Sequence, residues 1–587
     1  MTKKSYLEFI FLIFLGAATS LSLPPFNYVI INFITLSLLF AFLIKRSKEI
    51  KNKKIFFFYG WLFGFGYFIT NLYWISISLT FDESFKFLIP VTLIFIPAFL
   101  ALFYGLISFL FFIFKTKKVI SSFFLFSLIF GLTEYVRGSI LTGFPWNLIA
   151  YSFSNHLEIL NITSVIGTYG FNLFCISLFI SPAVFILRDT RADIWVCIFF
   201  LLITIIFYLY GSQSKKVFTE AEINSIDHKV RVIGSNIKLD RFYSNIDPIT
   251  AIEDLIELSE PDKNEKIIFV WPEGILPGIS QEKIVDYKWL FENHFNENHL
   301  LVLGINSKSV QRDTVKYFNS LSVYDHSLNL LSSYDKNNLV PFGEFLPLEN
   351  ILKNIGLKTL TNNYQSYSKG TERNIIKINK SDTSLKFLPL ICYEIIYSGR
   401  IFNNSDFDFI INISEDGWFG QSIGPKQHFI HSKYRAIESG KYVLRSSNNG
   451  ISAIINPIGD IEQEVSFNKT GYIDFSQFKK IQPTVFSKYG NRIFGLIILL
   501  YIFLIFSFNR INFYYESLGF DLGLVDEDDR ANVSIHPPIE GEKYYDSLIQ
   551  FNGEMNIKTG DIMMWWLLIA PLLYVVLIEN RKFFEEE

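Results

Sequence analysis

The sequence predicts two parts, a polytopic α-helical membrane domain and a layered α/β domain. Half of the 587 residues are hydrophobic and only 19% are charged, whereas soluble globular chains carry about a quarter charged residues. Apolar runs of roughly 18 residues or more account for this excess and are typical of membrane helices. Between residues 212 and 490, short apolar runs alternate with polar, helix-compatible stretches, which indicates an α/β or a layered α+β domain.

The long apolar runs predict eight membrane spans before residue 511. They are expected at residues 6–23, 28–44, 55–80, 88–114, 119–137, 160–186, 193–211 and 491–508. The predicted domains are a helical bundle (1–211), a soluble domain (212–490), a C-terminal membrane helix (491–510) and an appended polar tail of unknown role (511–587). Within the tail, residues 562–578 form a candidate ninth span.

The charges in the short loops predict the orientation of these spans. The segments "KRSKEIKNKK" (45–54), "KTKK" (115–118) and "RDTR" (188–191) are basic, whereas the alternate loops "PPFN" (24–27) and "FDESFK" (81–86) are neutral or acidic. Lysine and arginine in short loops remain on the cytoplasmic side of a membrane. The soluble domain is therefore expected on the outer face.

Composition also excludes several classes of site. The net charge of -3 gives no basic field for a nucleic acid partner. Of the three cysteines, Cys175 and Cys197 lie inside apolar runs, which excludes a disulfide framework and a zinc cluster. The histidines show no ligand spacing, so we expect neither a metal nor a cofactor.

Three side chains with matching chemistry follow strand-like apolar runs: Glu273 in "IIFVWPEGILPG", Lys336 in "LNLLSSYDKNNLVPFGEF" and Cys392 in "KFLPLICYE". Reacting groups of α/β folds collect at strand ends, so the three are expected to converge. An ammonium favours the thiolate, a carboxylate can accept the thiol proton, and a lysine can face an oxyanion. Such a set predicts acyl transfer through a thioester. Taken singly, each residue has a plainer explanation as a buried apolar cysteine, a capping glutamate or a surface lysine.

Longer motifs surround these residues. They are "TGFPWNLIAY" (142–151), "WPEG" (271–274), "YDKNNLVPFGEFLPLE" (334–349), "ICYEI" (391–395), "DGWFGQSIGPKQHF" (416–429) and "LRSSNNGISAII" (444–455). With them the chain resembles the nitrilase (carbon–nitrogen hydrolase) superfamily, and specifically its membrane-embedded branch, the apolipoprotein N-acyltransferases, over roughly residues 6–508. The resemblance implies an αββα sandwich in which Glu273 is the general base, Lys336 stabilises the oxyanion and Cys392 is the nucleophile.

The same resemblance implies supporting residues. Glu344, Tyr393 and Glu394 would assist the triad, with loop-fixing hydrogen bonds as the alternative role. Trp418 and Phe419 would belong to an aromatic, substrate-binding wall or serve as plain core anchors.

Two further features remain open from the sequence. An aromatic residue often follows the first strand in this family, and both Phe242 and Tyr243 in "GSNIKLDRFYSN" fit that position. Glu134 and Arg137 lie three residues apart near the end of a predicted span, which indicates an intramembrane ion pair. The pair could be structural or could position a lipid headgroup.

The resemblance also implies a reaction and a location. The acyl donor would be a phosphatidylethanolamine-like phospholipid, and the acceptor would be the N-terminal amine of a diacylglyceryl apolipoprotein in the same bilayer. The protein would be a multi-pass bacterial inner-membrane enzyme with its catalytic domain on the periplasmic side. The alternatives are a membrane-tethered amidase that hydrolyses a small amide, and a non-catalytic scaffold or transporter, which predicts that a triad member is missing.

Overall fold

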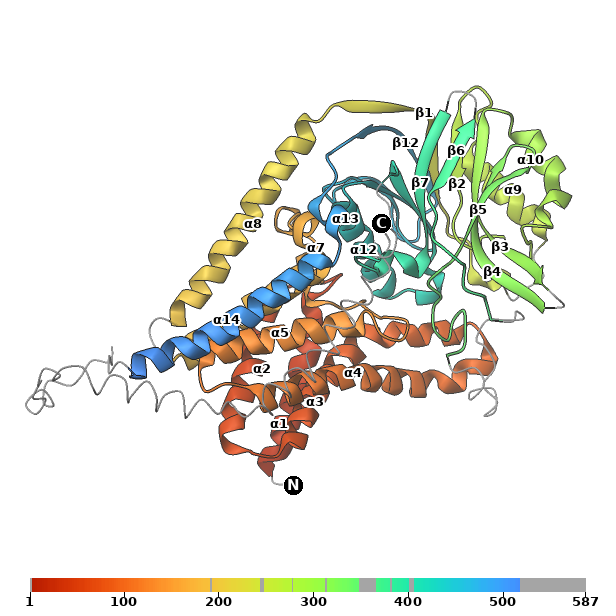
Figure 1. Cartoon of the computed structure of the whole chain (residues 1–587). Coiled ribbons are helices and arrows are strands. Elements are labelled where there is room, and N and C mark those ends of the chain that lie inside the picture. The colour runs from red at the N-terminus through yellow and green to blue at the C-terminus, as the bar shows by residue number, and fades with distance from the viewer. Residues whose placement is uncertain are drawn as a thin grey trace, which may run out of the picture. The chain divides into compact units, whose positions relative to one another are not determined.

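The computed structural model of the chain is drawn in Figure 1. It describes residues 3–189, 193–242, 247–276, 278–311, 314–347, 366–380, 383–400 and 406–517. Met1–Tyr501 form one compact unit that holds both the helical bundle and the α/β domain. The tail from residue 518 onward, including the candidate span at 562–578, lies outside the described residues.

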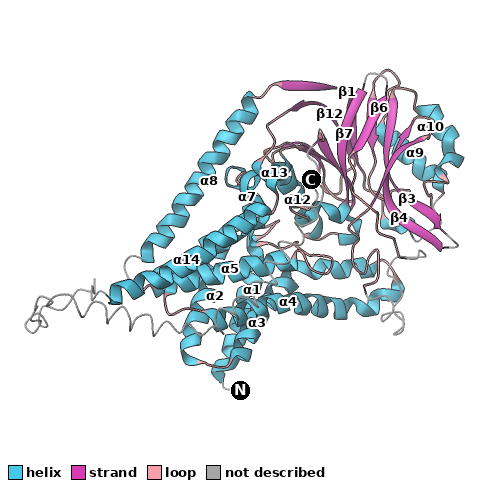
Figure 2. Cartoon of the chain, in the orientation of Figure 1, coloured by secondary structure: helices cyan, strands magenta, loops and turns pink. Residues whose placement is uncertain are grey.

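The predicted spans are helices in the structure (Figures 1 and 2). Their bounds are α1 Lys3–Thr19, α2 Ile30–Glu49, α3 Lys53–Leu72, α4 Ile89–Phe114, α5 Val119–Arg137, α7 Thr163–Leu187, α8 Ile194–Glu220 and α14 Arg492–Ser517. Seven helical stretches within the described residues are long and apolar enough to cross a membrane. The run at the predicted first span is shorter, Tyr6–Ser22, and at about 1.5 Å per residue it falls just below the thickness of a bilayer core.

Three of the predicted spans differ from the observed helices. The helix predicted to end at residue 508, α14, continues to Ser517. The run at 55–80 is an α-helix only to Leu72 and continues as the 3₁₀ segment η2, Tyr73–Thr80. The helix predicted to end at residue 211 continues to Glu220, because the polar stretch after Gly211 contains no glycine or proline to end it. The α/β domain was predicted to begin at residue 212, but its first strand begins at Ile223.

The α/β domain contains two six-stranded mixed sheets (Figure 2). The first has the order β12-β1-β2-β3-β4-β5, and the second β11-β10-β9-β8-β7-β6. The strands of the first sheet are β1 Ile223–Gly234, β2 Ile267–Val270, β3 His299–Gln311, β4 Thr314–Asp325, β5 Leu330–Asp335 and β12 Gly471–Lys479. Those of the second are β6 Ile376–Lys380, β7 Thr383–Ile391, β8 Phe409–Glu415, β9 Tyr442–Asn448, β10 Ser452–Ile455 and β11 Ile461–Val465.

The two sheets pack face to face, with helices on their outer faces. In β2, Ile268 and Val270 enter the core between the sheets, whereas Ile267 and Phe269 pack against helices α9, Pro248–Ser259, and α10, Lys288–His294. Because both faces of such a strand are buried, it is a continuous apolar run. Helix α12, Gly424–Ser439, packs between β9 of the second sheet and α7 of the bundle. The order helix, sheet, sheet, helix confirms the αββα sandwich.

The buried pair Glu134 and Arg137 has a structural role. Arg137 Nη2 lies 2.6 Å from Glu134 Oε2, and both side chains are fully buried. Arg137 also donates to the backbone carbonyls of Phe144 and Asn147. Four N–H groups of the guanidinium are therefore used within the protein, and they fix the loop that follows α5.

Candidate active site

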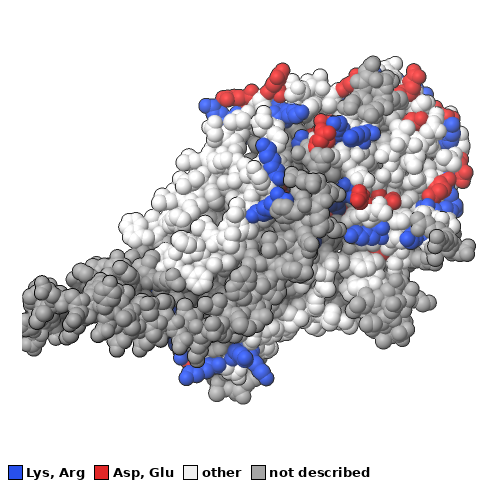
Figure 3. Space-filling view, in the orientation of Figure 1, with Lys and Arg blue, Asp and Glu red and all other residues white. Residues whose placement is uncertain are grey.

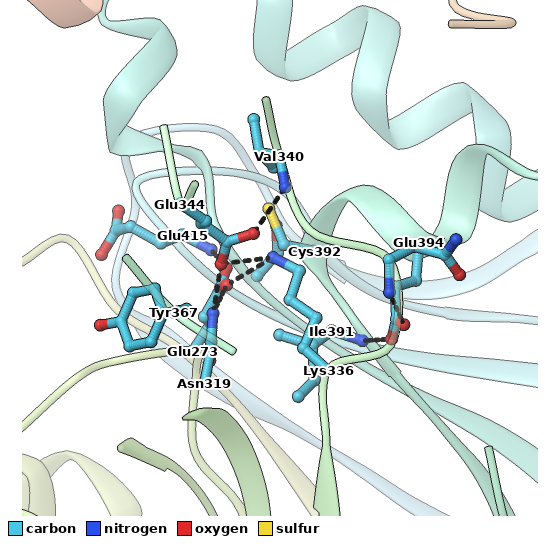
Figure 4. A network of polar contacts seen from close by, with 12 residues as sticks. Glu273, Asn319, Lys336, Val340, Glu344, Tyr367, Ile391, Cys392, Glu394 and Glu415 are labelled. Atoms are coloured by element: carbon cyan, nitrogen blue, oxygen red, sulfur yellow. Dashed lines mark hydrogen bonds and ion pairs between the residues drawn. The ribbon is translucent and has the colours of Figure 1, made fainter. Parts of the chain in front are cut away.

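Cys392 lies at a sharp turn between β7 and a short 3₁₀ helix, η8, Cys392–Ile396. Its φ angle is +49°, a left-handed conformation that non-glycine residues rarely adopt. Such strain is common where a nucleophile is held at the end of a strand. Figure 4 shows the sulfur beside the Lys336 ammonium and the carboxylates of Glu273 and Glu344. The side chain is 8% exposed.

Lys336 follows β5 and joins two carboxylates. Its Nζ lies 3.2 Å from Glu273 Oε1 and 3.0 Å from Glu344 Oε1, and the side chain is 1% exposed. An ammonium carries three N–H donors, so these bonds leave one donor for a substrate atom. Glu344 is held in turn by the backbone N–H of Val340, which donates to its Oε2 at 2.8 Å. The predicted triad and Glu344 therefore meet at one place.

Two further groups hold the carboxylates. Asn319, on β4, donates from the same Nδ2 to Glu273 Oε1 at 2.7 Å and to Glu344 Oε1 at 2.8 Å. The backbone N–H of Glu415, at the end of β8, donates to Glu273 Oε2 at 2.9 Å. Glu273 thus accepts three hydrogen bonds, in the manner of an ionised carboxylate, and its orientation is set by two sheets.

The electrostatics of the cysteine differ from the expectation that a neighbouring ammonium would yield a thiolate. Burial, together with the Glu273 carboxylate, holds the pKa of the Cys392 thiol well above its ordinary value, and Lys336 offsets this only in part. Burial also opposes the charge on Lys336, but the Glu273 and Glu344 carboxylates outweigh it and raise the pKa of its ammonium. The resting site therefore pairs a protonated thiol with a charged lysine, because burial and Glu273 together outweigh the effect of Lys336 on the thiol.

Glu394 faces away from the triad and fixes the two loops that carry it (Figure 4). Its Oε1 accepts hydrogen bonds from the backbone N–H groups of Asn337 and Asn338, just after Lys336, at 2.9 and 3.0 Å. Its Oε2 accepts from the N–H of Ile391, just before Cys392, at 3.0 Å. Arg373 Nη2 lies 2.7 Å from Oε1. Burial alone would raise the pKa of this carboxyl, but Arg373 and the surrounding donors hold it below its ordinary value.

The remaining predicted residues connect the site to the helical bundle. The Tyr393 hydroxyl donates to the carbonyl of Gly143, in the loop after α5, at 2.9 Å. Phe419 packs edge-to-face on Trp74 of η2, with ring centroids 4.7 Å apart. Trp418 is partly exposed and meets Phe81 at 5.9 Å. Phe419 and Trp418 thus both contact the segment between α3 and α4.

Asn319, which holds both carboxylates, was not predicted from the sequence. Asn319 is a polar residue within the apolar run "YFNSLSVYD", which is the only local sign of its role. Tyr243 and the side chain of Phe242, the two candidates for the aromatic position after the first strand, lie outside the described residues. Within the described part of the chain, no three His, Cys, Asp or Glu side chains are grouped so as to hold a metal ion.

Comparison with known proteins identifies both parts of the chain. Residues 15–180 match the apolipoprotein N-acyltransferase N-terminal domain, and residues 251–476 match the carbon-nitrogen hydrolase family. Among solved structures, Nit3 of Saccharomyces cerevisiae, a member of branch 10 of the nitrilase superfamily, matches with 17% identity and a TM-score of 0.30, covering 42% of this chain and 89% of that one.

Two curated relatives extend this match over most of the chain. Apolipoprotein N-acyltransferase of Rhodopseudomonas palustris is 31% identical over 496 residues, which cover 81% of this chain and 90% of the relative. The protein of the same name from Rickettsia prowazekii is 34% identical over 483 residues, covering 81% and 93%. Because this identity extends over nearly the full length of both relatives, the chain belongs to the apolipoprotein N-acyltransferase family.

Proposed function

We propose that the protein transfers a fatty acyl chain from a phospholipid to the N-terminal α-amine of a diacylglyceryl-cysteine apolipoprotein, through a thioester on Cys392. The observation that carries this proposal is the buried group of Glu273, Lys336 and Glu344 beside Cys392 in a chain of this family. Glu273 is the proton acceptor, Lys336 the cation for the oxyanion and Cys392 the nucleophile.

In the first half-reaction, the Cys392 sulfur attacks the ester carbonyl carbon of the phospholipid. Because the resting thiol is protonated, Glu273 must take its proton as the carbon–sulfur bond forms. The remaining N–H donor of Lys336 faces the developing oxyanion, an interaction worth about 3 kcal/mol per donor in comparable sites. The tetrahedral intermediate collapses, the ester C–O bond breaks, and the departing lysophospholipid oxygen takes the proton from Glu273.

In the second half-reaction, the neutral amine of the apolipoprotein attacks the thioester carbon. Glu273 removes a proton from the attacking nitrogen, an amide bond forms, and the sulfur leaves and recovers the proton. Glu344 holds Lys336 in place through both halves, since it pairs with the ammonium independently of Glu273. Burial of the sulfur limits hydrolysis of the thioester by water.

The membrane helices are explained by the substrates. Moving an acyl chain out of the bilayer costs about 0.8 kcal/mol per CH₂ group, so the enzyme must bring its thiol to the lipid. Figure 3 shows Lys and Arg side chains gathered at the end of the bundle that carries the α2–α3 loop. This pattern supports a bacterial inner-membrane protein whose catalytic domain is periplasmic.

The proposal is tested by intact-mass and peptide mass spectrometry of the full-length chain in detergent with phosphatidylethanolamine vesicles. We expect a fatty-acyl mass increment that maps to Cys392, with release of lysophospholipid, and no increment in Cys392→Ala. Adding a diacylglyceryl lipopeptide should discharge the adduct and acylate the peptide amine. Discharge at the same rate in buffer, without amine acylation, would favour a hydrolase instead. An adduct on any other residue would refute the assigned nucleophile.

Gly304 on β3 provides a test of the position of Glu273. A Cβ atom at residue 304 would lie 2.4 Å from the Pro272 carbonyl oxygen and 2.5 Å from Glu273 Cα, both backbone atoms that cannot turn aside. We expect Gly304→Ala to displace Glu273 and to slow adduct formation by about tenfold to a hundredfold. Gly495→Ala in α14 is the matched control, because its added Cβ has open space beyond its own stretch of helix. Equal rates in the two variants would show that the Glu273 loop tolerates displacement.

A further inference from the structure

A second buried polar cluster lies next to the Cys392 turn and has no part in the proton transfers above. It consists of Asp416, after β8, His428 on α12 and Arg445 on β9, each at most 1% exposed. Arg445 Nη2 lies 2.8 Å from Asp416 Oδ2, and the Ser414 hydroxyl donates to Asp416 Oδ1 at 2.7 Å. Asp416 and Arg445 thus form a neutral pair, in which Arg445 also donates to Asn412 Oδ1 and to the carbonyl of Ile451, and the pair contacts the imidazole.

The imidazole of His428 connects this pair to the nucleophile. Its Nδ1 lies 2.8 Å from Asp416 Oδ1 and 3.2 Å from Arg445 Nη2, and its Nε2 lies 3.3 Å from the backbone carbonyl oxygen of Cys392. A carbonyl oxygen only accepts, so the last contact is favourable when Nε2 carries a hydrogen. The imidazolium satisfies this condition and also donates from Nδ1 to Asp416 Oδ1. The neutral Nε2–H tautomer satisfies it too, but its Nδ1 lone pair then faces the Asp416 carboxylate at 2.8 Å and accepts only from Arg445. The neutral Nδ1–H tautomer would place two lone pairs against each other.

The ring is also confined on its faces. Trp146, in the loop after α5, stacks on it with centroids 5.2 Å apart and an interplanar angle of 23°. Phe419 meets it edge-to-face at 5.6 Å. The neighbouring residue, Gln427, accepts hydrogen bonds from the indole N–H groups of Trp74 and Trp146 at 3.3 and 2.9 Å. The helical bundle therefore fixes the part of α12 that reaches the nucleophile.

Cys392 needs such support because its left-handed φ of +49° is unfavourable for an L-residue with a side chain. The turn is held at two points. Glu394 accepts from the N–H of Ile391 on the amino side, and His428 meets the carbonyl of Cys392 on the carboxyl side. Loss of either contact frees the peptide groups that determine where the sulfur points.

We propose that His428 is a positioning residue, whose Nε2–H holds the Cys392 carbonyl so that the sulfur faces Glu273 and Lys336. Asp416 and Arg445 orient the ring. The consequence for acyl transfer rests on the proposed function, whereas the effect on the direction of the sulfur does not.

Two substitutions of His428 distinguish a role in positioning Cys392 from a purely structural role in the buried cluster. The amide nitrogen of glutamine takes roughly the place of Nε2, and the shorter asparagine reaches only the place of Nδ1. We expect His428→Gln to keep much of the wild-type rate of Cys392 alkylation by iodoacetamide and of acylation by phosphatidylethanolamine. His428→Asn should keep the pairing with Asp416 but slow both rates by about tenfold or more. His294→Asn, at an exposed histidine on α10, is the control and should change neither rate.

The measurements are peptide-mapped alkylation and adduct formation in the full-length chain, with thermal unfolding recorded for each variant. Equal rates for the Gln and Asn variants, or a slower Gln variant, would overturn the proposal and leave His428 a structural residue. If the Asn variant does not fold, a tenfold loss in His428→Gln alone would overturn it, and retention would support it. If wild type is alkylated but forms no acyl adduct, the proposed function fails while the alkylation comparison still decides the role of His428.

Discussion

Glu273→Gln should slow acylation of Cys392 by about two to four orders of magnitude, the usual contribution of a general base, and yet make the cysteine easier to alkylate. The amide cannot accept the thiol proton, so the attack on the ester loses its base. The same substitution removes a negative charge that raises the pKa of the Cys392 thiol and leaves Lys336, which lowers it. The pKa of the thiol therefore falls, and at a given neutral pH a larger fraction is thiolate.

The two rates should thus change in opposite directions. They are followed by intact mass, as iodoacetamide alkylation between about pH 6 and pH 10, across the thiol range, and as adduct formation from phosphatidylethanolamine. The control is Glu292→Gln, at an exposed carboxylate on α10, which should leave both rates unchanged. A parallel fall of alkylation and acylation would show that Glu273 acts on the position of the sulfur and not on its proton.

Lys336→Met should lower both the rate of acylation and the free energy of unfolding. Removing the cation from the oxyanion site slows acylation by about a hundredfold to a thousandfold. It also leaves the Glu273 and Glu344 carboxylates, both bonded to Asn319, buried without a counter-charge. Breaking a buried ion pair in this way lowers the free energy of unfolding by roughly 3–5 kcal/mol. Because Lys336 lowers the pKa of Cys392, its removal raises that pKa further, and alkylation at neutral pH should slow.

Thermal unfolding in detergent and the same two mass assays check these expectations. Lys288→Met is the matched control, since Lys288 also pairs with a carboxylate, Glu292 at 3.3 Å, but on an exposed helix surface. Exposed pairs contribute about 0–1 kcal/mol, so this variant should unfold near the wild-type temperature. Faster alkylation in Lys336→Met than in wild type would contradict the assigned electrostatics. Glu273→Gln and Lys336→Met should therefore shift the pKa of the Cys392 thiol in opposite directions.

The residue pattern by itself determined where the bundle helices lie and that a domain of alternating strands and helices follows them, whereas the αββα sandwich was implied by the family resemblance. These features depend on local patterns: runs of apolar residues long enough to span a bilayer, and short buried strands such as β2. The ends of the helices were harder to predict. In α8 no residue after Gly211 ends the helix, so the helix propensities of its residues do not mark where it leaves the membrane. The sequence also singled out Glu273, Lys336 and Cys392, since each ends a strand-like run within a longer motif.

Only the tertiary structure decided how these groups act on one another. The pKa of Cys392 depends on burial and on the balance between Glu273 and Lys336, and both are set by distances between segments far apart in the chain. The hydrogen bonds of Asn319 to two carboxylates and the contact of His428 with the Cys392 carbonyl likewise join different strands and helices. Electrostatic interactions depend on separation in space and on the surrounding dielectric, neither of which a linear pattern of residues records.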